Sequence, residues 1–305
     1  MSVENFSRLP FHGCNFLESL PSSIPRYQYV GIQQFHNIIN IEFDRLIDDI
    51  AISSQEFNQQ KKGKNDQQLD NNILQHTDHT LNTQKHGSSR KPKNHQPADE
   101  FVLFTIDSDS LKRDFLDSHT LNSYIDSFDI KNELLLVKMA STIHSNAIGE
   151  ISRAIDKALE HIGLADQVKR FEGAVIRGAD ENGQGKGKVG DHGWGLQTPP
   201  AGFPDKPTVT LTVAYSESEK KLRSDVEFWL NPDQGCANTT LTLRIDKTSP
   251  FLIFSNWQKA KLVTRHSTHW KGIEKVQTII ITMGDDGEVT VSGHPLVIPF
   301  ELFFR

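Results

Sequence analysis

Phosphate binding is the first chemistry that the glycine spacing of this sequence suggests. Residues 185–190 read G-K-G-K-V-G, which has the G-x-G-x-x-G spacing of dinucleotide-binding loops. Such a loop needs a strand before it and a helix after it, because the helix N-terminus holds the pyrophosphate. The segment 191–195, D-H-G-W-G, is followed by Pro199 and Pro200, so no helix is expected there. We therefore interpret residues 178–190 as a glycine-rich, charged loop without a nucleotide site.

The histidines and cysteines do not form a complete metal site or nucleophilic site. His266 and His269 could pair on a metal near Trp270, but no third ligand is nearby, and surface histidines are the favoured interpretation. Cys14 and Cys236 are the only cysteines, and two distant thiols form neither a disulfide framework nor a four-ligand zinc site. The sequence supports no Ser-His-Asp or Cys-His arrangement.

The composition favours a soluble protein inside the cell. The formal net charge of the 305 residues is -6, which argues weakly against wholesale binding to nucleic acid or an anionic membrane. A local basic cleft remains compatible with this charge. The first ten residues contain Glu4 and Arg8 and lack an apolar core, so they are not a signal peptide. Because no stretch approaches the ~20 apolar residues of a membrane helix, we expect a cytoplasmic or nuclear location and no membrane partner.

Three regions separate by composition. Residues 1–52 are predicted to form a helical segment, because apolar residues recur at helical spacing between Phe35 and Ile47. Residues 53–98 are rich in Gln, Asn, Lys, His and Ser and are predicted to be a disordered linker. We interpret its basic cluster at 90–93 as part of a solvated insertion. The alternative interpretation is a nuclear-import or nucleic-acid-tethering tail. Residues 99–305 are predicted to form the folded domain.

The folded domain begins with a strand and a helix. Apolar residues run from 133 to 139 and predict a buried strand. A helix is expected from about Ile143 to His161, capped by Ser141 or Thr142 and ended by Gly163. A second strand is predicted from Arg170 to Arg177.

A strand with two different faces follows at 207–215, where valine, leucine and tyrosine alternate with threonine and alanine. Ser216 and Glu219 have the spacing of a capping box, so a helix is expected to begin there and to end before Asn231-Pro232. The remaining strands are predicted at 241–245, 251–254, 276–283 and 288–292, the last two as a hairpin. The fold class is therefore α/β (α+β), a mixed central sheet flanked by helices.

Four segments match, in order, the motifs of one known protein family. The first is K-M-A-S-T-I-H at 138–144, which is similar to the family's "K-M-P-S-x-x-H-E". The second is K-V-G-D-H-G-W at 188–194, similar to "K-x-P-D-x-x-W". The third runs from Pro207 to Leu230 and resembles "P-T-L-V-x-E-V-G-Y-S-E-S-x-x-x-L-R-x-D-x-x-W-L", and the fourth, near 293–301, resembles "G-x-L-x-I-P-F-E". With these four motifs, roughly the last 170 residues resemble a family of fungal proteins assigned to the PD-(D/E)XK, or restriction-endonuclease-like, nuclease superfamily. The resemblance implies a PD-(D/E)XK-like core.

This resemblance implies a Mg²⁺ site built from two acids and a lysine, which activates water for phosphodiester cleavage. Asp191 matches the first acid and would be the metal ligand, and a solvated loop aspartate after Gly190 is the alternative that the local sequence supports equally. Thr212 stands at the position of the second acid, and Ala214 stands where a nuclease keeps its lysine. Because a neutral hydroxyl is a poor ligand for a hard dication, the catalytic site is interpreted as degenerate.

Acids and lysines from the next helix could restore the site. Glu217 could reach it from the strand end, and the cation could come from Lys220, Lys221 or Arg223. The simpler interpretations are a first-turn helix acid and a solvated helix face. Lys188 and Arg223 are the residues that could contact nucleic acid.

Three hypotheses follow. The first is a degenerate nuclease-like domain, a pseudoenzyme without a cofactor that binds DNA or a protein. The second is a divergent Mg²⁺-dependent endonuclease that uses Asp191, Glu217 and a helix lysine. The third is a structural remnant without either activity.

Overall fold

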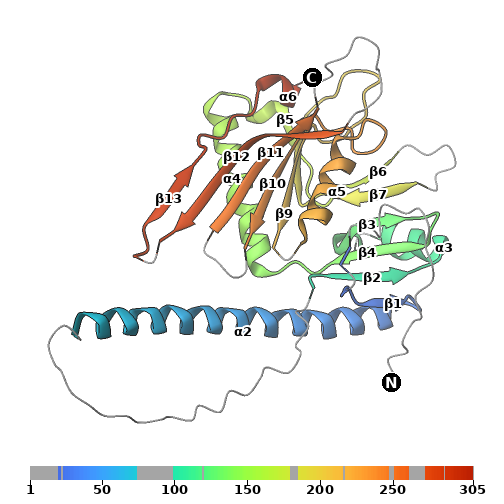
Figure 1. Ribbon diagram of the computed structural model, residues 1–305. Coiled ribbons are helices and arrows are strands. Elements are labelled where there is room, and N and C mark those ends of the chain that lie inside the picture. The colour runs from blue at the N-terminus through green and yellow to red at the C-terminus, as the bar shows by residue number, and fades with distance from the viewer. Residues whose placement is uncertain are drawn as a thin grey trace.

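The computed structural model describes residues 20–21, 23–73, 99–118, 120–178, 185–215, 217–246, 251–260, 272–284 and 286–304, with the side chains of the first long helix described as far as residue 52. These residues form two mixed sheets with helices packed against them (Figure 1). The predicted mixed α and β class is confirmed. The expectation of a single central sheet is wrong, because six strands form one sheet and seven form another.

Sheet A is the six-stranded sheet and has the order β1-β2-β4-β3-β7-β6. Its first two strands run parallel, and the other neighbouring pairs run antiparallel. The strands are β1 (Arg26–Gln28), β2 (Phe101–Thr105), β3 (Ile125–Asp129), β4 (Leu134–Lys138), β6 (Val175–Arg177) and β7 (Lys186–Val189). The predicted strand at 133–139 is confirmed as β4.

The long helix α2 (Ile32–Ile73) covers one face of sheet A with its N-terminal part and extends beyond this sheet (Figure 1). Phe35, Ile39 and Leu46 point into the same apolar core as Val102 and Phe104 of β2. The first turns of α2 therefore contribute to the core of sheet A. The helix also runs through positions 53–73, which corrects the prediction that disorder begins at residue 53. The rest of that predicted linker lies outside the described residues.

Sheet B is the seven-stranded sheet and has the order β13-β12-β11-β10-β9-β8-β5. Only β9 and β10 run parallel, because helix α5 (Glu219–Leu230) forms the crossover between them. The strands are β5 (Val168–Arg170), β8 (His192–Leu196), β9 (Val209–Ala214), β10 (Thr239–Ile245), β11 (Phe251–Lys259), β12 (Ile273–Met283) and β13 (Val289–Ser292).

Helices α4 (Thr142–His161) and α5 lie on opposite faces of sheet B. Ile155 of α4 joins the apolar cluster that includes Val209 and Leu211 of β9, whereas Val226 of α5 packs with Trp257 on the other side. The Ser141 hydroxyl accepts a hydrogen bond from the His144 amide at 3.2 Å, and Gly163 after the last turn has φ +73, so the predicted ends of α4 are confirmed.

The remaining helical segments are short. They are α3 (Ser108–Leu111), a π-helical turn (Lys112–Leu116), two 3₁₀ turns (Asn122–Tyr124 and Ala165–Gln167) and α6 (Phe300–Phe304). Among the described helices, none combines the length and the apolar character required to cross a lipid bilayer.

Three local predictions are corrected. The single strand at 170–177 is two strands in different sheets, because the chain turns through Gly173 at φ +63. The predicted loop at 178–190 contains β7, whose Gly187 lies against the ring of Phe128. The N-cap of α5 is Ser218, whose hydroxyl accepts from the Lys221 amide at 3.1 Å, and Ser216 lies outside the described residues.

Candidate functional site

A cluster of charged side chains is buried where sheet A meets sheet B. None of its members exposes more than 12% of its side chain, although isolated buried charges are costly. We call it the buried charge cluster, and its members are Glu100, Asp126, Lys138, Lys188, Asp191, Glu217, Lys221 and Asp225. It is the described region whose residue types could perform acid, base or metal chemistry.

The sheet A members come from the strands. Asp126 lies in β3, Lys138 is the last residue of β4, and Lys188 lies in β7. Because β3 lies between β4 and β7 in the sheet, these side chains are brought together by long-range pairing. Glu100 directly precedes β2, and its carboxylate is fully buried.

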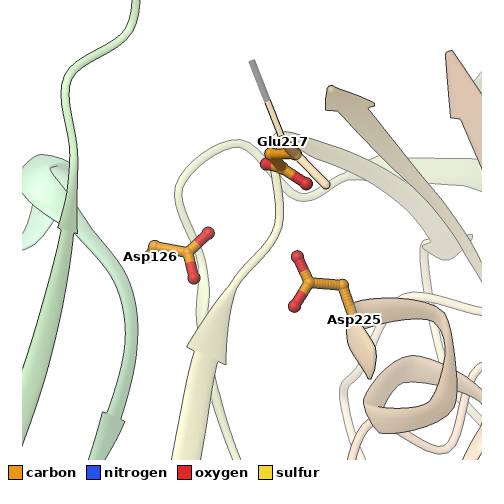
Figure 2. A group of neighbouring side chains, drawn as sticks. All are labelled: Asp126, Glu217 and Asp225. Carbon is orange, nitrogen blue, oxygen red and sulfur yellow. The ribbon is translucent and has the colours of Figure 1, made fainter. Parts of the chain in front are cut away.

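The sheet B members come mainly from the start of α5. Lys221 and Asp225 are four residues apart and therefore lie on the same face of the helix. Glu217 precedes the N-cap Ser218, and Figure 2 shows its carboxylate turned toward those of Asp126 and Asp225. Asp191 lies in the short connection between β7 and β8.

Two lysines join Asp126 and Asp225 across the two sheets. The Lys221 ammonium lies 2.6 Å from Asp225 Oδ2 and 3.1 Å from Asp126 Oδ2. The Lys188 ammonium lies 3.0 Å from each of the same two oxygens. Burial raises the pKa of Asp126, but the two ammonium groups outweigh burial and hold this pKa well below its ordinary range.

Asp191 is fully engaged by groups of the chain. Its Oδ2 accepts from the Val213 amide at 2.7 Å, and its Oδ1 lies 3.1 Å from His144 Nε2. The Lys138 ammonium lies 3.3 Å and 3.4 Å from the two oxygens. Burial raises the pKa of Asp191, but Lys138, His144 and the Val213 amide together hold it well below its ordinary value.

Lys138 links Asp191 to Glu217. Its ammonium lies 3.2 Å from Glu217 Oε1 and donates to the Val213 carbonyl at 3.0 Å. Burial lowers the pKa of Lys138, yet the carboxylates of Asp191 and Glu217 raise it well above its ordinary value, so the side chain stays charged. Burial raises the pKa of Glu217 to about 7, and the nearby carboxylates add to this effect against the two lysines.

The Mg²⁺ site that the nuclease resemblance implies does not fit these residues. Such a site needs Asp191 and a second acid to share one cation, and the Lys138 ammonium lies between Asp191 and Glu217 instead. Thr212 occupies the position of the missing acid, and its buried hydroxyl makes no hydrogen bond within the described residues. We therefore derive no catalytic step through a metal at Asp191.

The other predicted site residues fall into two groups. Lys188 and Lys221 belong to the buried charge cluster, together with Asp191 and Glu217, so they do not form a surface for nucleic acid. Lys220 is exposed on α5, and Arg223 is exposed and pairs with Glu227 at 3.3 Å. Neither side chain takes part in the cluster. His266 and His269, interpreted from the sequence as surface histidines, lie outside the described residues.

Glu100, Asp126 and Asp225 were missed as site residues, as were Lys138 and His144. Asp225 had a detectable signal, because it lies one helical turn after Lys221 on a predicted helix. Glu100 and Asp126 had no local signal, since their partners lie in distant strands. Asp126 nevertheless belongs with Glu217 and Asp225 to the group of three carboxylates, found within the described residues, whose oxygens lie within 4.8 Å of one another.

A large apolar groove lies elsewhere, on the α4 face of sheet B. Its volume is about 840 Å³, and residues such as Ile151, Leu243 and Phe303 line it. Glu150 is its one ionisable lining residue among those described, and this side chain pairs with Arg153 in solvent. The groove therefore offers no chemistry, and the buried charge cluster remains the candidate site.

Comparisons with known proteins do not assign this chain to a family. Neither a family model, nor a curated protein, nor a solved structure matches it.

Proposed function

We propose that this chain is a nuclease-like domain that does not cleave phosphodiester bonds and acts by binding a partner. The observation that carries the proposal is the Lys138 ammonium, 3.3 Å from Asp191 and 3.2 Å from Glu217. A lysine here supplies the positive charge that a divalent ion would supply, but it cannot polarise a phosphate and a water together as a metal can.

The order of the elements supports the nuclease-like part of the proposal. A strand and helix α4 are followed by the antiparallel strands β5, β8 and β9 of sheet B. Helix α5 then crosses over to the parallel strand β10. This is the order of strand, helix, strands, helix and strand that the sequence pattern predicts, and the proposal interprets it as a PD-(D/E)XK-like core.

A nuclease assay tests the loss of cleavage. We expect the purified chain to leave single- and double-stranded DNA and RNA intact in Mg²⁺ and in Mn²⁺, because Asp191 has no free oxygen to offer. Cleavage that disappears in Asp191→Asn would overturn the proposal. The matched control is Asp205→Asn, which alters an exposed ion pair with Lys169.

A protein partner is favoured over DNA. The lysines nearest to Asp191 and Asp126 already form buried ion pairs, so they cannot contact a DNA phosphate. The net charge of the chain is -6, which also disfavours DNA binding. We expect fluorescence anisotropy to give only nonspecific DNA affinity, with a dissociation constant in the range of about 10⁻⁶ to 10⁻⁴ M at physiological salt. Tighter binding that weakens in Arg223→Gln would assign the partner to nucleic acid instead.

A divergent Mg²⁺-dependent nuclease is the second candidate, and one observation favours it. Glu217 faces Asp126 and Asp225, and Lys221 lies 2.6 Å from Asp225, so acids and a lysine do meet beside α5. Cleavage lost in Asp225→Asn but retained in Asp191→Asn would support this candidate and exclude the original metal position. A cytoplasmic or nuclear location is part of both candidates.

A further inference from the structure

Glu217 differs from the aspartates of the buried charge cluster in its hydrogen bonds. Its side chain is fully buried, and neither carboxyl oxygen accepts a hydrogen bond from any described residue. Asp126, Asp191 and Asp225 each accept at least one hydrogen bond from a lysine. The lysines therefore compensate the three aspartates, whereas a negative charge on Glu217 has no hydrogen-bond donor.

The ammonium group nearest to Glu217 is directed at other acceptors. Lys138 Nζ lies 3.2 Å from Glu217 Oε1, but this contact is not a hydrogen bond. The same ammonium donates to the Val213 carbonyl at 3.0 Å and to the two Asp191 oxygens at 3.3 Å and 3.4 Å. An ammonium group has three hydrogens, so Lys138 attracts Glu217 only through space.

Like charges also surround Glu217. Figure 2 shows its carboxyl group turned toward those of Asp126 and Asp225. Across the whole cluster, five carboxyl groups meet only three ammonium groups. The charged groups that face Glu217 are Asp126 of β3, Lys138 of β4, Lys221 and Asp225 of α5, and Glu100 directly before β2. Behind them lie Lys188 of β7, paired with Asp126 and Asp225, and Asp191, paired with Lys138.

Uptake of one proton relieves this arrangement. Burial of a neutral carboxyl group costs far less than burial of a carboxylate that lacks hydrogen bonds. Its hydroxyl can also donate to a facing carboxylate, as in sites where two carboxyl groups share one proton. We propose that Glu217 is a pH-sensitive switch at the junction of the two sheets, which is tight while its carboxyl group carries a proton and loosens when that proton is released.

The position of Glu217 explains how one proton reaches both sheets. Glu217 directly precedes the N-cap Ser218 of α5 beside sheet B, and Lys138 is the last residue of β4 in sheet A. An ionised Glu217 competes with Asp191 for the Lys138 ammonium. Release of the proton therefore weakens the hydrogen bonds from Lys138 to Asp191 and to the Val213 carbonyl, which connect the two sheets.

The surroundings of Glu217 set the pH at which the switch operates. Burial is the largest effect and raises the pKa of Glu217 from 4.5 to about 7; Asp225 and Glu100 add to this rise, and Lys138 and Lys221 oppose it. A carboxyl group whose pKa is raised by folding stabilises the folded state fully below its unfolded value, and this contribution is lost as pH rises through the folded value. The junction should therefore loosen as pH rises from 4.5 to about 7.

Carbon-13 NMR of the full chain, labelled at the glutamate side-chain carboxyl, tests the proton directly. EDTA is present throughout to exclude divalent ions. We expect one glutamate signal with a midpoint near pH 7, and Glu217→Gln should lack it. The control Glu150→Gln, which alters an exposed ion pair with Arg153, should keep this signal.

Urea denaturation of the same chains tests the coupling to stability. Glu217→Gln resembles the protonated form and cannot ionise, so it should unfold much like the unchanged chain at about pH 5. At about pH 8 the variant should be the more stable, with a change in the ratio of the two unfolding constants on the order of 100-fold. Glu150→Gln should show no such pH-dependent difference.

Hydrogen–deuterium exchange locates the loosening. At about pH 8, residues 209–221 should exchange faster in the unchanged chain than in Glu217→Gln, and at about pH 5 the two should be equal. Strand β12 is the internal control, because it contributes no residue to the cluster, and its exchange should be the same in both chains.

Three results would overturn the inference. The first is an unchanged chain without a glutamate signal that titrates between about pH 6 and pH 8, which is decisive even if the variant does not fold. The second is a near-neutral signal that persists in Glu217→Gln. The third is a difference in stability, or in exchange at 209–221, that does not change with pH.

This inference is independent of the proposed loss of cleavage. A chain whose Glu217 does not titrate near neutral pH can still lack nuclease activity, and a nuclease assay does not alter the NMR titration. Each can therefore fail alone.

Discussion

At the scale of single residues, Lys138 is the group on which the buried charge cluster depends most. Its ammonium contacts Asp191, Glu217 and the Val213 carbonyl, and it lies 5.7 Å from the centre of the Phe101 ring. Removing one partner of a buried ion pair leaves an uncompensated charge, which costs more than the pair itself contributed. Lys138 is therefore a sensitive position.

We expect Lys138→Met to lower the free energy of unfolding by about 3–5 kcal/mol at pH 7, because the buried carboxylates of Asp191 and Glu217 lose the ammonium group that they share. Urea denaturation measures the change. Lys220→Met is the matched control, since Lys220 is exposed on α5, and its effect should stay within about 0.5 kcal/mol. Equal effects of the two substitutions would show that Lys138 is not an essential partner.

The depressed pKa of Asp191 predicts a defined acid sensitivity. A group whose pKa is lowered by folding stabilises the folded state above its unfolded pKa, near 3.8, and this contribution is lost as pH falls toward the folded value. Urea denaturation between about pH 7 and pH 3 should show stability falling below about pH 5. Asp191→Asn should be less stable at pH 7, and its deficit should shrink as pH falls. A deficit that does not change with pH would contradict the assignment.

Residue types together with the family resemblance indicated half of the buried charge cluster. Four members were named from the sequence, each in a separate role: Asp191 as a metal ligand, Glu217 as an acid, Lys188 as a nucleic-acid contact and Lys221 as a helix cation. They were not predicted to belong to one buried network. The partners Asp126 and Glu100 lie in or beside apolar strands, where a single acid carries no local pattern. Only the pairing of distant strands brings them to α5.

At the scale of elements, close backbone packing in sheet A gives a further prediction. Gly187 in β7 lies against Phe128, and a Cβ there would clash with the ring. We expect Gly187→Ala to destabilise the chain by about 1–3 kcal/mol. Gly149→Ala, on the exposed side of α4 with no atom within 4 Å of the added Cβ, should instead stabilise it by about 0.5–1 kcal/mol. Denaturant titration of both variants checks the opposite signs, and a shared sign would refute the packing explanation.

The elements with strong local patterns were predicted well. Helix α4, strand β9 and the hairpin of β12 and β13 follow from periodicity, caps and turn residues. The division into two sheets did not follow, because β5 and β6 are short, lie close together in sequence, and join different sheets through pairings with β8 and β7. Periodicity identifies a strand but not its neighbour.

At the scale of the whole molecule, the buried charge cluster joins two bodies that have separate apolar cores. Sheet A and α2 enclose one core, and sheet B and α4 enclose another. Between them lie the ion pairs from Lys188 and Lys221 to Asp126 and Asp225. A displacement of one sheet relative to the other would separate these buried charges from their partners, which is costly in a low-dielectric interior.

Crystals of this chain soaked in Mn²⁺ test most directly the claim that the nuclease metal site at Asp191 is lost. Anomalous scattering locates any bound Mn²⁺ without reference to activity. We expect no peak within coordination distance of Asp191, whose oxygens remain bound to Lys138, His144 and the Val213 amide. A peak coordinated by Asp191, with the Lys138 ammonium moved away, would contradict the loss of the nuclease metal site.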